Sequence, residues 1–148
     1  MATLANSYDP ATCDALVSVS PRTSIEQAAW LMREHDVGAL PVVDRDVLVG
    51  IVTDRDMVVR GLAERRDGWI SRVSDIMTTE VFTCRSDDEP HVAAMIMALR
   101  QVRRVLVVDE AGRLTGIVSL ADLVRDTCEG ADFAIRQVSA PTRTYPPA

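Results

Sequence analysis

The sequence predicts a mixed α/β fold (α+β) made of two similar units, each running strand, helix, strand, strand, helix. The first observation behind this prediction is an internal repeat that covers most of residues 17–63 and 82–127. The second is that both copies change from a helical spacing of apolar residues to two β-rich runs. Neither copy is long enough to bury a large core by itself. We therefore expect the two units to pack against each other.

The repeat is clearest along the β-rich runs. Residues 40–44 (Leu-Pro-Val-Val-Asp) align with residues 105–109 (Val-Leu-Val-Val-Asp) at an offset of 65. After one inserted residue the offset becomes 66, and residues 50–53 (Gly-Ile-Val-Thr) align with residues 116–119 (Gly-Ile-Val-Ser). Equivalent positions of the two units are therefore defined along most of the chain.

The first helix of each unit is predicted by apolar residues that recur at helical spacing. In the first unit a capping box precedes this stripe, with Thr23 or Ser24 as its first member. Glu26 or Gln27 stands three residues later and completes the box. In the second unit Pro90 suits the first helical turn. The stripes consist of Ile25, Ala28, Ala29 and Met32 in the first unit and Ala93, Ala94 and Met97 in the second.

Two predicted strands and a second helix follow in each unit. Turn-forming residues separate the strands, at 44–46 in the first unit and at 109–112 in the second. The predicted strands cover 39–43, 48–53, 104–108 and 114–119, and the predicted helices cover 55–63 and 120–127.

These elements define the expected organisation of the whole chain. The connector between the units holds residues 73–77, which we expect to form a short helical turn. The expected segments are a loose N-terminus at 1–12, a first unit at 13–63, a connector at 64–80, a second unit at 81–128, and a C-terminal tail at 129–148 whose end is disordered.

Composition narrows the functional classes. The chain has 148 residues with 16 basic and 22 acidic side chains, a net charge of −6, and this acidic balance argues against nucleic-acid binding. All the basic residues are Arg, so a Walker A loop and a Schiff-base lysine are excluded. No apolar run is long enough to cross a membrane, and the N-terminus lacks the pattern of a secretory signal. We expect a cytoplasmic protein that does not bind membranes.

The sequence offers no enzymatic constellation. Cys13, Cys84 and Cys128 have no ligand-like spacing, and we interpret them as reduced structural thiols. His35 and His91 stand at non-equivalent places in the two units, so neither a metal site nor a nucleophile–base pair is indicated. We therefore expect a protein that is not an enzyme.

The strongest site motif lies where the last strand of each unit meets its second helix. It reads Gly-x-x-Thr53-x-x-Asp56 in the first unit and Gly-x-x-Ser119-x-x-Asp122 in the second. A helix N-terminus presents free N–H groups to anions, and a carboxylate facing a vicinal diol makes strong hydrogen bonds. The alternative is that the hydroxyl and the carboxylate only cap the helix, with no ligand. The motif alone leaves both interpretations open.

These patterns together resemble a tandem pair of CBS domains, also called a Bateman module. The resemblance rests on residues 20–25, 32–44 and 50–56 in the first copy and on residues 102–109 and 116–122 in the second. The first copy also resembles small stand-alone CBS-pair proteins of actinobacteria, including the mycobacterial hypoxic response type.

The resemblance implies an architecture and a ligand. Two units pack about a pseudo-two-fold axis and leave two clefts, and two modules pair into a disc-like homodimer. In many family members the clefts bind AMP, ADP, ATP or S-adenosylmethionine. By this resemblance Asp56 and Asp122 accept hydrogen bonds from ribose hydroxyls, while Thr53 and Ser119 orient ribose or phosphate.

Arginines distinguish the two expected sites. Arg103 and Arg104 precede a predicted strand, where family members carry basic residues that reach phosphates, and Arg is well suited to phosphate. Arg55 within the first motif is a further candidate. The counterparts of these arginines, Gly38-Ala39 and Ala121, are uncharged, so we expect one ligand per chain. The alternative is that Arg103 and Arg104 pair with surface acids such as Glu110.

Gly38 has two expected roles of its own. It allows a tight turn from helix to strand, and it leaves room for a flat adenine ring.

The function predicted from these features is that of a regulatory, non-enzymatic module that requires no cofactor. It binds an adenine nucleotide (AMP, ADP or ATP) between its units and signals to a separate, unidentified partner protein. One alternative is a ligand-free interaction dimer in which the Asp residues only cap helices. Another is a sensor of S-adenosylmethionine, whose sulfonium cation and lack of phosphate would not need the arginines.

Overall fold

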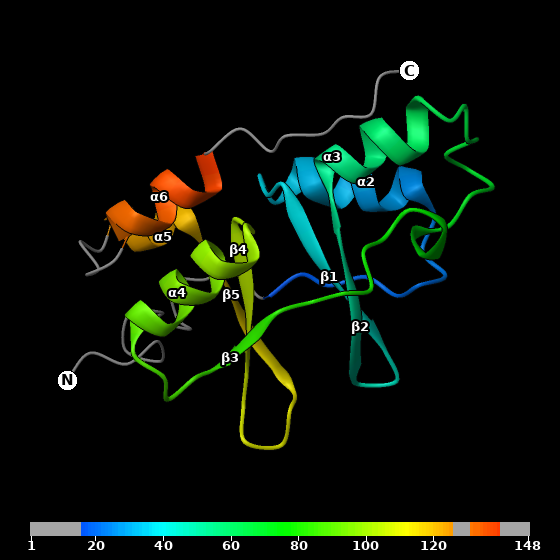
Figure 1. Cartoon of the computed structure of the whole chain (residues 1–148). Coiled ribbons are helices and arrows are strands. Elements are labelled where there is room, and N and C mark those ends of the chain that lie inside the picture. The colour runs from blue at the N-terminus through cyan, green and yellow to red at the C-terminus, as the bar shows by residue number, and fades with distance from the viewer. Residues whose placement is uncertain (1–15, 126–130, 140–148) are drawn as a thin grey trace.

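The computed structural model describes residues 16–125 and 131–139 of the chain. It is a mixed α/β fold whose strands lie in the middle, with the helices of the two units at opposite ends (Figure 1). The first unit contains α2 (Ile25–Glu34), β1 (Ala39–Asp44), β2 (Val47–Thr53), α3 (Asp54–Asp56) and the π-helix η1 (Met57–Leu62). The connector carries the 3-10 helix η2 (Val73–Asp75). The second unit contains β3 (Thr83–Arg85), α4 (Pro90–Arg100), β4 (Arg104–Val108), β5 (Leu114–Ser119), α5 (Leu120–Arg125) and α6 (Ala131–Ser139).

The sheet of the first unit is an antiparallel hairpin of β1 and β2. Its two-residue turn places Arg45 and Asp46 at φ values of 49° and 66°, the left-handed conformation that a tight hairpin turn requires. The predicted early strand of this unit is wrong as a full strand. It is reduced to one parallel bridge between Val19 and Val42.

The sheet of the second unit has three strands in the order β3-β4-β5. The early strand is present here as β3, which runs parallel to β4, and β5 pairs antiparallel to β4. The register shifts between Val107 and Val108, and it also shifts between Val42 and Val43 in the first sheet. These positions are equivalent at the repeat offset of 65, so the repeat extends to the irregularities of the backbone.

The first helix of each unit begins as the sequence predicts. Ser24, rather than Thr23, is the N-cap of α2, and its Oγ accepts a hydrogen bond of 3.1 Å from the Gln27 backbone N–H. Pro90 lies in the first turn of α4. The predicted apolar stripe of α2 is wrong at Ala29, which is exposed because α2 buries only a narrow face against the sheet.

The second helix of the first unit differs from the prediction of one regular helix over 55–63. A single turn, α3, is followed by the wider η1, in which the Ala63 N–H bonds to the Val58 carbonyl five residues earlier, at 2.9 Å. Gly61, a weak helix former, is buried within this segment. In the second unit α5 is a regular helix, and the last two residues of its predicted span lie outside the described residues.

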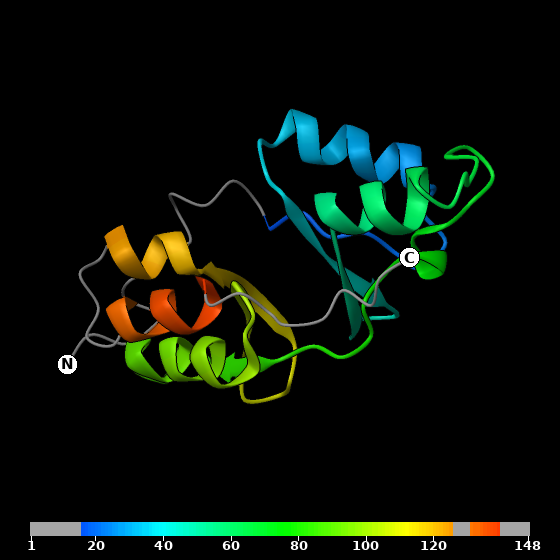
Figure 2. The same cartoon turned by 45° about the horizontal axis from the view of Figure 1, so that its top comes forward.

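The segment predicted as a C-terminal tail contains α6, a helix that was not predicted. Ala134 of α6 is completely buried in the core of the second unit. Figure 2 shows α6 lying against α4, with α5 beside them. Residues 1–12, expected to be loose, and the end of the tail, expected to be disordered, lie outside the described residues.

Each unit has its own buried core. Leu40 and Val105, on equivalent strands, belong to the first and second core respectively. Val73 and Ile76 of the connector complete the first core. Ala39 and Pro41 are also buried, yet alternation along a strand puts them on the opposite face of β1 from Leu40. The first sheet therefore carries buried residues on both faces, and its own helix α2 packs on the face of Leu40.

Within residues 16–125 and 131–139, no helix is both long and apolar enough to span a membrane.

Candidate functional site

The motif of the first unit forms a complete capping box at the end of β2. Asp56 Oδ2 accepts hydrogen bonds from the Thr53 backbone N–H at 2.9 Å and from the Thr53 hydroxyl at 2.8 Å. In return the Asp56 N–H donates to Thr53 Oγ1 at 3.2 Å. The box therefore occupies one carboxylate oxygen of Asp56 and leaves Oδ1 outside it.

The motif of the second unit has the same geometry. Asp122 Oδ2 accepts from the Ser119 N–H at 2.8 Å and from the Ser119 hydroxyl at 2.6 Å, and the Asp122 N–H donates to Ser119 Oγ at 3.2 Å. Arg125 donates to the other oxygen, Asp122 Oδ1, at 2.7 Å. Both motifs thus form the hydrogen bonds of a capping box, and in both units only Oδ1 points outside the box.

Backbone hydrogen bonds place the start of one strand beside each capping box. The Asp54 N–H donates to the Gly38 carbonyl at 3.1 Å, and the Leu120 N–H donates to the Arg103 carbonyl at 2.9 Å. Arg104 lies opposite Ser119 in the register of β4 and β5. The fold therefore brings the predicted phosphate-binding segment 103–104 next to the second capping box.

The side chain of Arg104 reaches from the second unit to the first. A Cβ atom added to Gly38 would lie 3.1 Å from Arg104 Nη2 and 3.0 Å from Asp54 Oδ2. Gly38 has no left-handed φ, and the left-handed residue before β1 is Asp36 at φ 51°. The expectation that Gly38 is needed for a tight turn is therefore corrected: this position lacks a side chain where Arg104 crosses between the units.

The alternative that Arg103 and Arg104 pair with surface acids is wrong for Glu110. The Glu110 carboxylate lies 3.7 Å from Arg85 instead. Neither Arg103 nor Arg104 forms an ion pair with another residue in the described part of the chain. Arg104 is half-buried, so its positive charge is partly removed from water without a bonded carboxylate.

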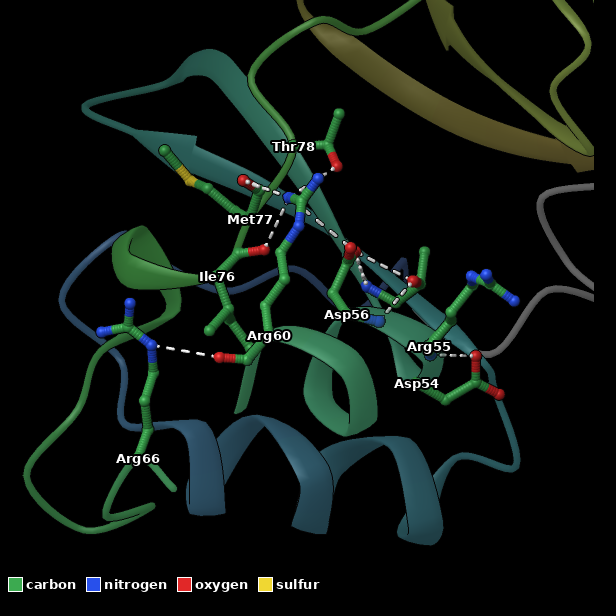
Figure 3. Close-up of polar contacts among 9 residues, drawn as sticks. Asp54, Arg55, Asp56, Arg60, Arg66, Ile76, Met77 and Thr78 are labelled. Carbon is green, nitrogen blue, oxygen red and sulfur yellow. Dashed lines mark hydrogen bonds and ion pairs between the residues drawn. The ribbon is translucent and has the colours of Figure 1, made fainter. Parts of the chain in front are cut away.

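Arg55 lies on α3 directly beside this position. Its backbone N–H donates to Asp54 Oδ1 at 2.7 Å, and its side chain is exposed. In Figure 3 the Arg55 guanidinium points away from the contacts that surround Asp56. Arg55 is thus near the first capping box but does not take part in it.

Arg60, a residue of η1, was not among the site residues predicted from the sequence. Its Nη1 lies 3.6 Å from Asp56 Oδ1, and it also donates to the Ile76 and Met77 carbonyls at 3.1 and 3.2 Å. The available signal was the spacing of four residues from Asp56, at which acidic and basic side chains meet on a helix. The connector contacts carried no signal, because the connector is far away in sequence.

Other reactive groups do not assemble a second centre in the described residues. Burial raises the pKa of the Cys84 thiol to about 11, with the nearby Asp88 charge adding to the effect, so the thiolate nucleophile is scarce at neutral pH. Cys13 and Cys128 lie outside the described residues. His91 contacts Glu89 at 3.0 Å. No group of three or more His, Cys, Asp or Glu side chains within 16–125 and 131–139 is arranged to hold a metal ion.

Comparison with known proteins identifies the family. The sequence profile of the CBS domain matches residues 12–61 and 73–127, so the chain belongs to the CBS domain family and carries two copies of the domain. It is 40% identical to the CBS domain-containing protein YhcV of Bacillus subtilis over 126 residues, which cover 84% of this chain and 89% of that protein.

Two further similarities bear on the type of CBS protein. The chain is 38% identical to Hypoxic response protein 1 of Mycobacterium tuberculosis over 114 residues, covering 76% of this chain and 79% of that one. The crystal structure of CBSX2 in complex with AMP superposes with a TM-score of 0.70 at 31% identity, covering 84% of this chain and 95% of that chain. The predicted resemblance to CBS-pair proteins of the hypoxic response type is confirmed.

Proposed function

We propose that this protein is a regulatory, non-enzymatic CBS pair of the cytoplasm. It binds an adenine nucleotide (AMP, ADP or ATP) between its two units and signals to a separate partner protein. The observation that carries the proposal is the position of Arg104. This half-buried arginine extends from the second unit to Gly38 and Asp54 of the first, and it has no ion pair among the described residues.

The pseudo-symmetry of the units favours one strong site. Arg104 brings a positive charge to the first capping box, whereas its counterpart at the repeat offset is Ala39, which has no charge. A nucleotide is therefore proposed to place its ribose at Thr53 and Asp56 and its phosphates toward Arg104, with Arg55 and Arg103 adding to the positive field. Ser119 and Asp122 form the equivalent, weaker ribose position.

Two further observations support adenine nucleotides as the ligand class. Asp56 Oδ1 stands outside the capping box and can accept a ribose hydroxyl without breaking a bond of the box. CBSX2, a solved structural neighbour, has AMP bound. S-adenosylmethionine shares the ribose and the adenine but has no phosphate for Arg104 to bind.

The capping geometry favours one alternative function, a ligand-free interaction module. Both Asp side chains already satisfy backbone N–H groups, so each has a structural role that needs no ligand. Under this alternative, removing either carboxylate lowers the free energy of unfolding and changes no ligand response.

The deciding experiment is thermal unfolding of ligand-stripped protein with AMP, ADP, ATP or S-adenosylmethionine added in turn. A ligand at a hundred times its Kd adds about 2.7 kcal/mol to the free energy of unfolding. For a chain of this size that corresponds to a rise in Tm of roughly 5–10 °C. A rise with a phosphate-containing nucleotide supports the proposal, and no rise with any of the four favours the interaction module.

A matched pair of arginine variants tests the role of Arg104. Arg104→Gln is expected to lower the affinity for the nucleotide about tenfold, because a charge-assisted contact to phosphate is lost. The control is Arg113→Gln, which removes the same charge from a mostly exposed side chain that pairs with Asp109 in a hairpin turn. Equal affinities of the two variants would contradict the phosphate role of Arg104.

We also propose that the chain forms a homodimer, as CBS pairs commonly do. Trp69 and Ile70 of the connector are 77% and 78% exposed, and Trp30 on α2 is 51% exposed, which leaves large apolar side chains for such an interface. Light scattering distinguishes a monomer of 16.2 kDa from a particle of twice that mass.

A further inference from the structure

Arg60 joins the first capping box to the connector through one atom. Figure 3 shows its guanidinium directed toward Asp56 and toward Ile76, Met77 and Thr78. Nη1 lies 3.1 Å from the Ile76 carbonyl, 3.2 Å from the Met77 carbonyl, 3.3 Å from Thr78 Oγ1 and 3.6 Å from Asp56 Oδ1. This nitrogen carries only two hydrogens for four oxygen atoms, so the four contacts share its donors.

The connector residues that Arg60 contacts lie where the chain passes from the first unit to the second. Ile76 is 1% exposed in the core of the first unit, and the chain then leaves for the second unit. Thr78 and Ile51 exchange two backbone hydrogen bonds, each 2.9 Å long, which fix the connector to β2. A change in the hydrogen bonds between Arg60 and residues 76–78 therefore affects the segment that connects the two units.

The other end of the contact lies at the proposed ligand position. Asp56 Oδ2 is occupied by Thr53, so a ribose hydroxyl reaching Asp56 has to bond Oδ1, the same oxygen that faces Arg60. The Asp56 side chain is only 14% exposed, so its charge is poorly screened by water. A ribose hydroxyl that donates to Oδ1 therefore competes with Arg60 for this carboxylate oxygen. The same Arg60 nitrogen also contacts the connector oxygens.

We propose that Arg60 is a positioning residue that couples occupancy of Asp56 to the connector. This inference rests on the proposed function and deepens it by naming the element that carries the signal. When a ribose hydroxyl bonds Oδ1, the Arg60 guanidinium turns its shared donors toward Ile76 and Met77 and holds the connector more tightly. Residues 76–78 are therefore the output element of the first site.

The second unit provides an internal control, because its Asp pairs with an arginine of its own short helix. Arg125 bonds Asp122 Oδ1 at 2.7 Å, and it forms no other hydrogen bond or ion pair with residues 16–125 or 131–139. The position equivalent to Arg60 at the offset of 66 is Asp126, an acidic residue. Among the described residues, the arginine link from the capping-box Asp to the connector is therefore seen in the first unit.

Amide hydrogen exchange at Ile51 and Thr78 tests the coupling, with Arg60→Gln and the matched Arg125→Gln. In ligand-free protein, Arg60→Gln is expected to speed exchange of both amides about tenfold, and Arg125→Gln to leave them unchanged. With AMP, exchange at both amides slows in the parent and in Arg125→Gln but not in Arg60→Gln. Arg60→Lys, which keeps the charge, is expected to recover part of the slowing.

The outcomes separate this inference from the proposed function. If AMP binds and slows exchange in Arg60→Gln as much as in the parent, the coupling role of Arg60 is overturned. If none of the four adenosine ligands binds the parent, the proposed function fails. The coupling between Asp56 and the connector through Arg60 can then still be tested in ligand-free protein. Asp56→Asn should then change Thr78 exchange severalfold in the parent and leave it unchanged in an Arg60→Gln background. Equal changes in both backgrounds would overturn the inference.

Discussion

The two units carry the same capping box in different surroundings. Thr53–Asp56 and Ser119–Asp122 agree in every hydrogen bond of the box. The first box lies near the Arg104 side chain of the other unit and is linked to the connector by Arg60, whereas Asp122 of the second box pairs with Arg125 of its own helix. A motif therefore fixes the local geometry of an Asp, while residues outside the motif decide what that Asp can do.

The cores of the two units differ in a similar way. Val19 and Cys84 are equivalent at the offset of 65, and each lies opposite an equivalent valine, Val42 or Val107. Val19 forms a single bridge, whereas Cys84 lies in a three-residue strand. Only the second unit places a titratable group at this buried position.

The largest effects are expected in the two cores. Leu40→Ala should lower the free energy of unfolding by about 3 kcal/mol, and Val105→Ala by about 2 kcal/mol because it removes one carbon fewer. Both residues are nearly inaccessible, at 1% and 0% exposure. Chemical denaturation should give one shifted transition for either variant, because neither unit has a large enough core to fold alone. Two separate transitions would contradict this dependence of the units on each other.

The next effect is a dependence of the free energy of unfolding on pH, caused by Cys84 of the second unit. The pKa of Cys84 is raised to about 11 in the folded chain from 9.0, so the unfolded chain loses its thiol proton first as pH rises. Between these values the folded state binds more protons than the unfolded state, and stability therefore falls with rising pH. The expected loss approaches about 2 kcal/mol near pH 11.

Cys84→Val, which copies the first unit, should remove this alkaline loss. The measurement is denaturant unfolding of the parent and the variant from pH 8 to pH 11. The difference in stability between the two should change across this range, and a constant difference would argue against titration of Cys84.

A smaller effect separates the two Asp residues. Asp56→Ala and Asp122→Ala should each lower the free energy of unfolding by about 1 kcal/mol, because both boxes have the same hydrogen bonds. Asp→Asn variants keep an acceptor for the box and lower the charge. Asp56→Asn should weaken AMP binding about tenfold, and Asp122→Asn less than threefold, because the Arg104 side chain extends toward the first unit. Calorimetric titration compares them, and equal losses would remove the distinction between the sites.

The smallest change in stability is expected at Gly38. In Gly38→Ala the new Cβ meets the flexible ends of the Asp54 and Arg104 side chains, at 3.0 and 3.1 Å, so both can move by a few tenths of an ångström. The free energy of unfolding should change by less than about 1 kcal/mol. AMP affinity should nonetheless fall, because Arg104 is displaced. Unchanged affinity would show that the exact position of Arg104 is unimportant.

Much of the fold follows from the sequence because its signals are local. Strands β4 and β5 have the predicted bounds, and Pro90 marks the start of α4 as predicted. The predictions fail where a neighbour decides the outcome. Ala29 is exposed because the sheet touches only part of α2, and α6 forms against α4 and α5 without a strong capping signal.

The candidate site likewise combines features set by local sequence with contacts between residues far apart in the chain. The sequence by itself determined the two units, their alternating strands and the two capping boxes, because each depends on residues a few positions apart. Only the tertiary structure decided that Arg104 reaches Gly38 and that Arg60 holds the connector. These contacts join residues 66 and 16 positions apart, and their formation depends on how whole elements pack, which no local pattern of side chains specifies.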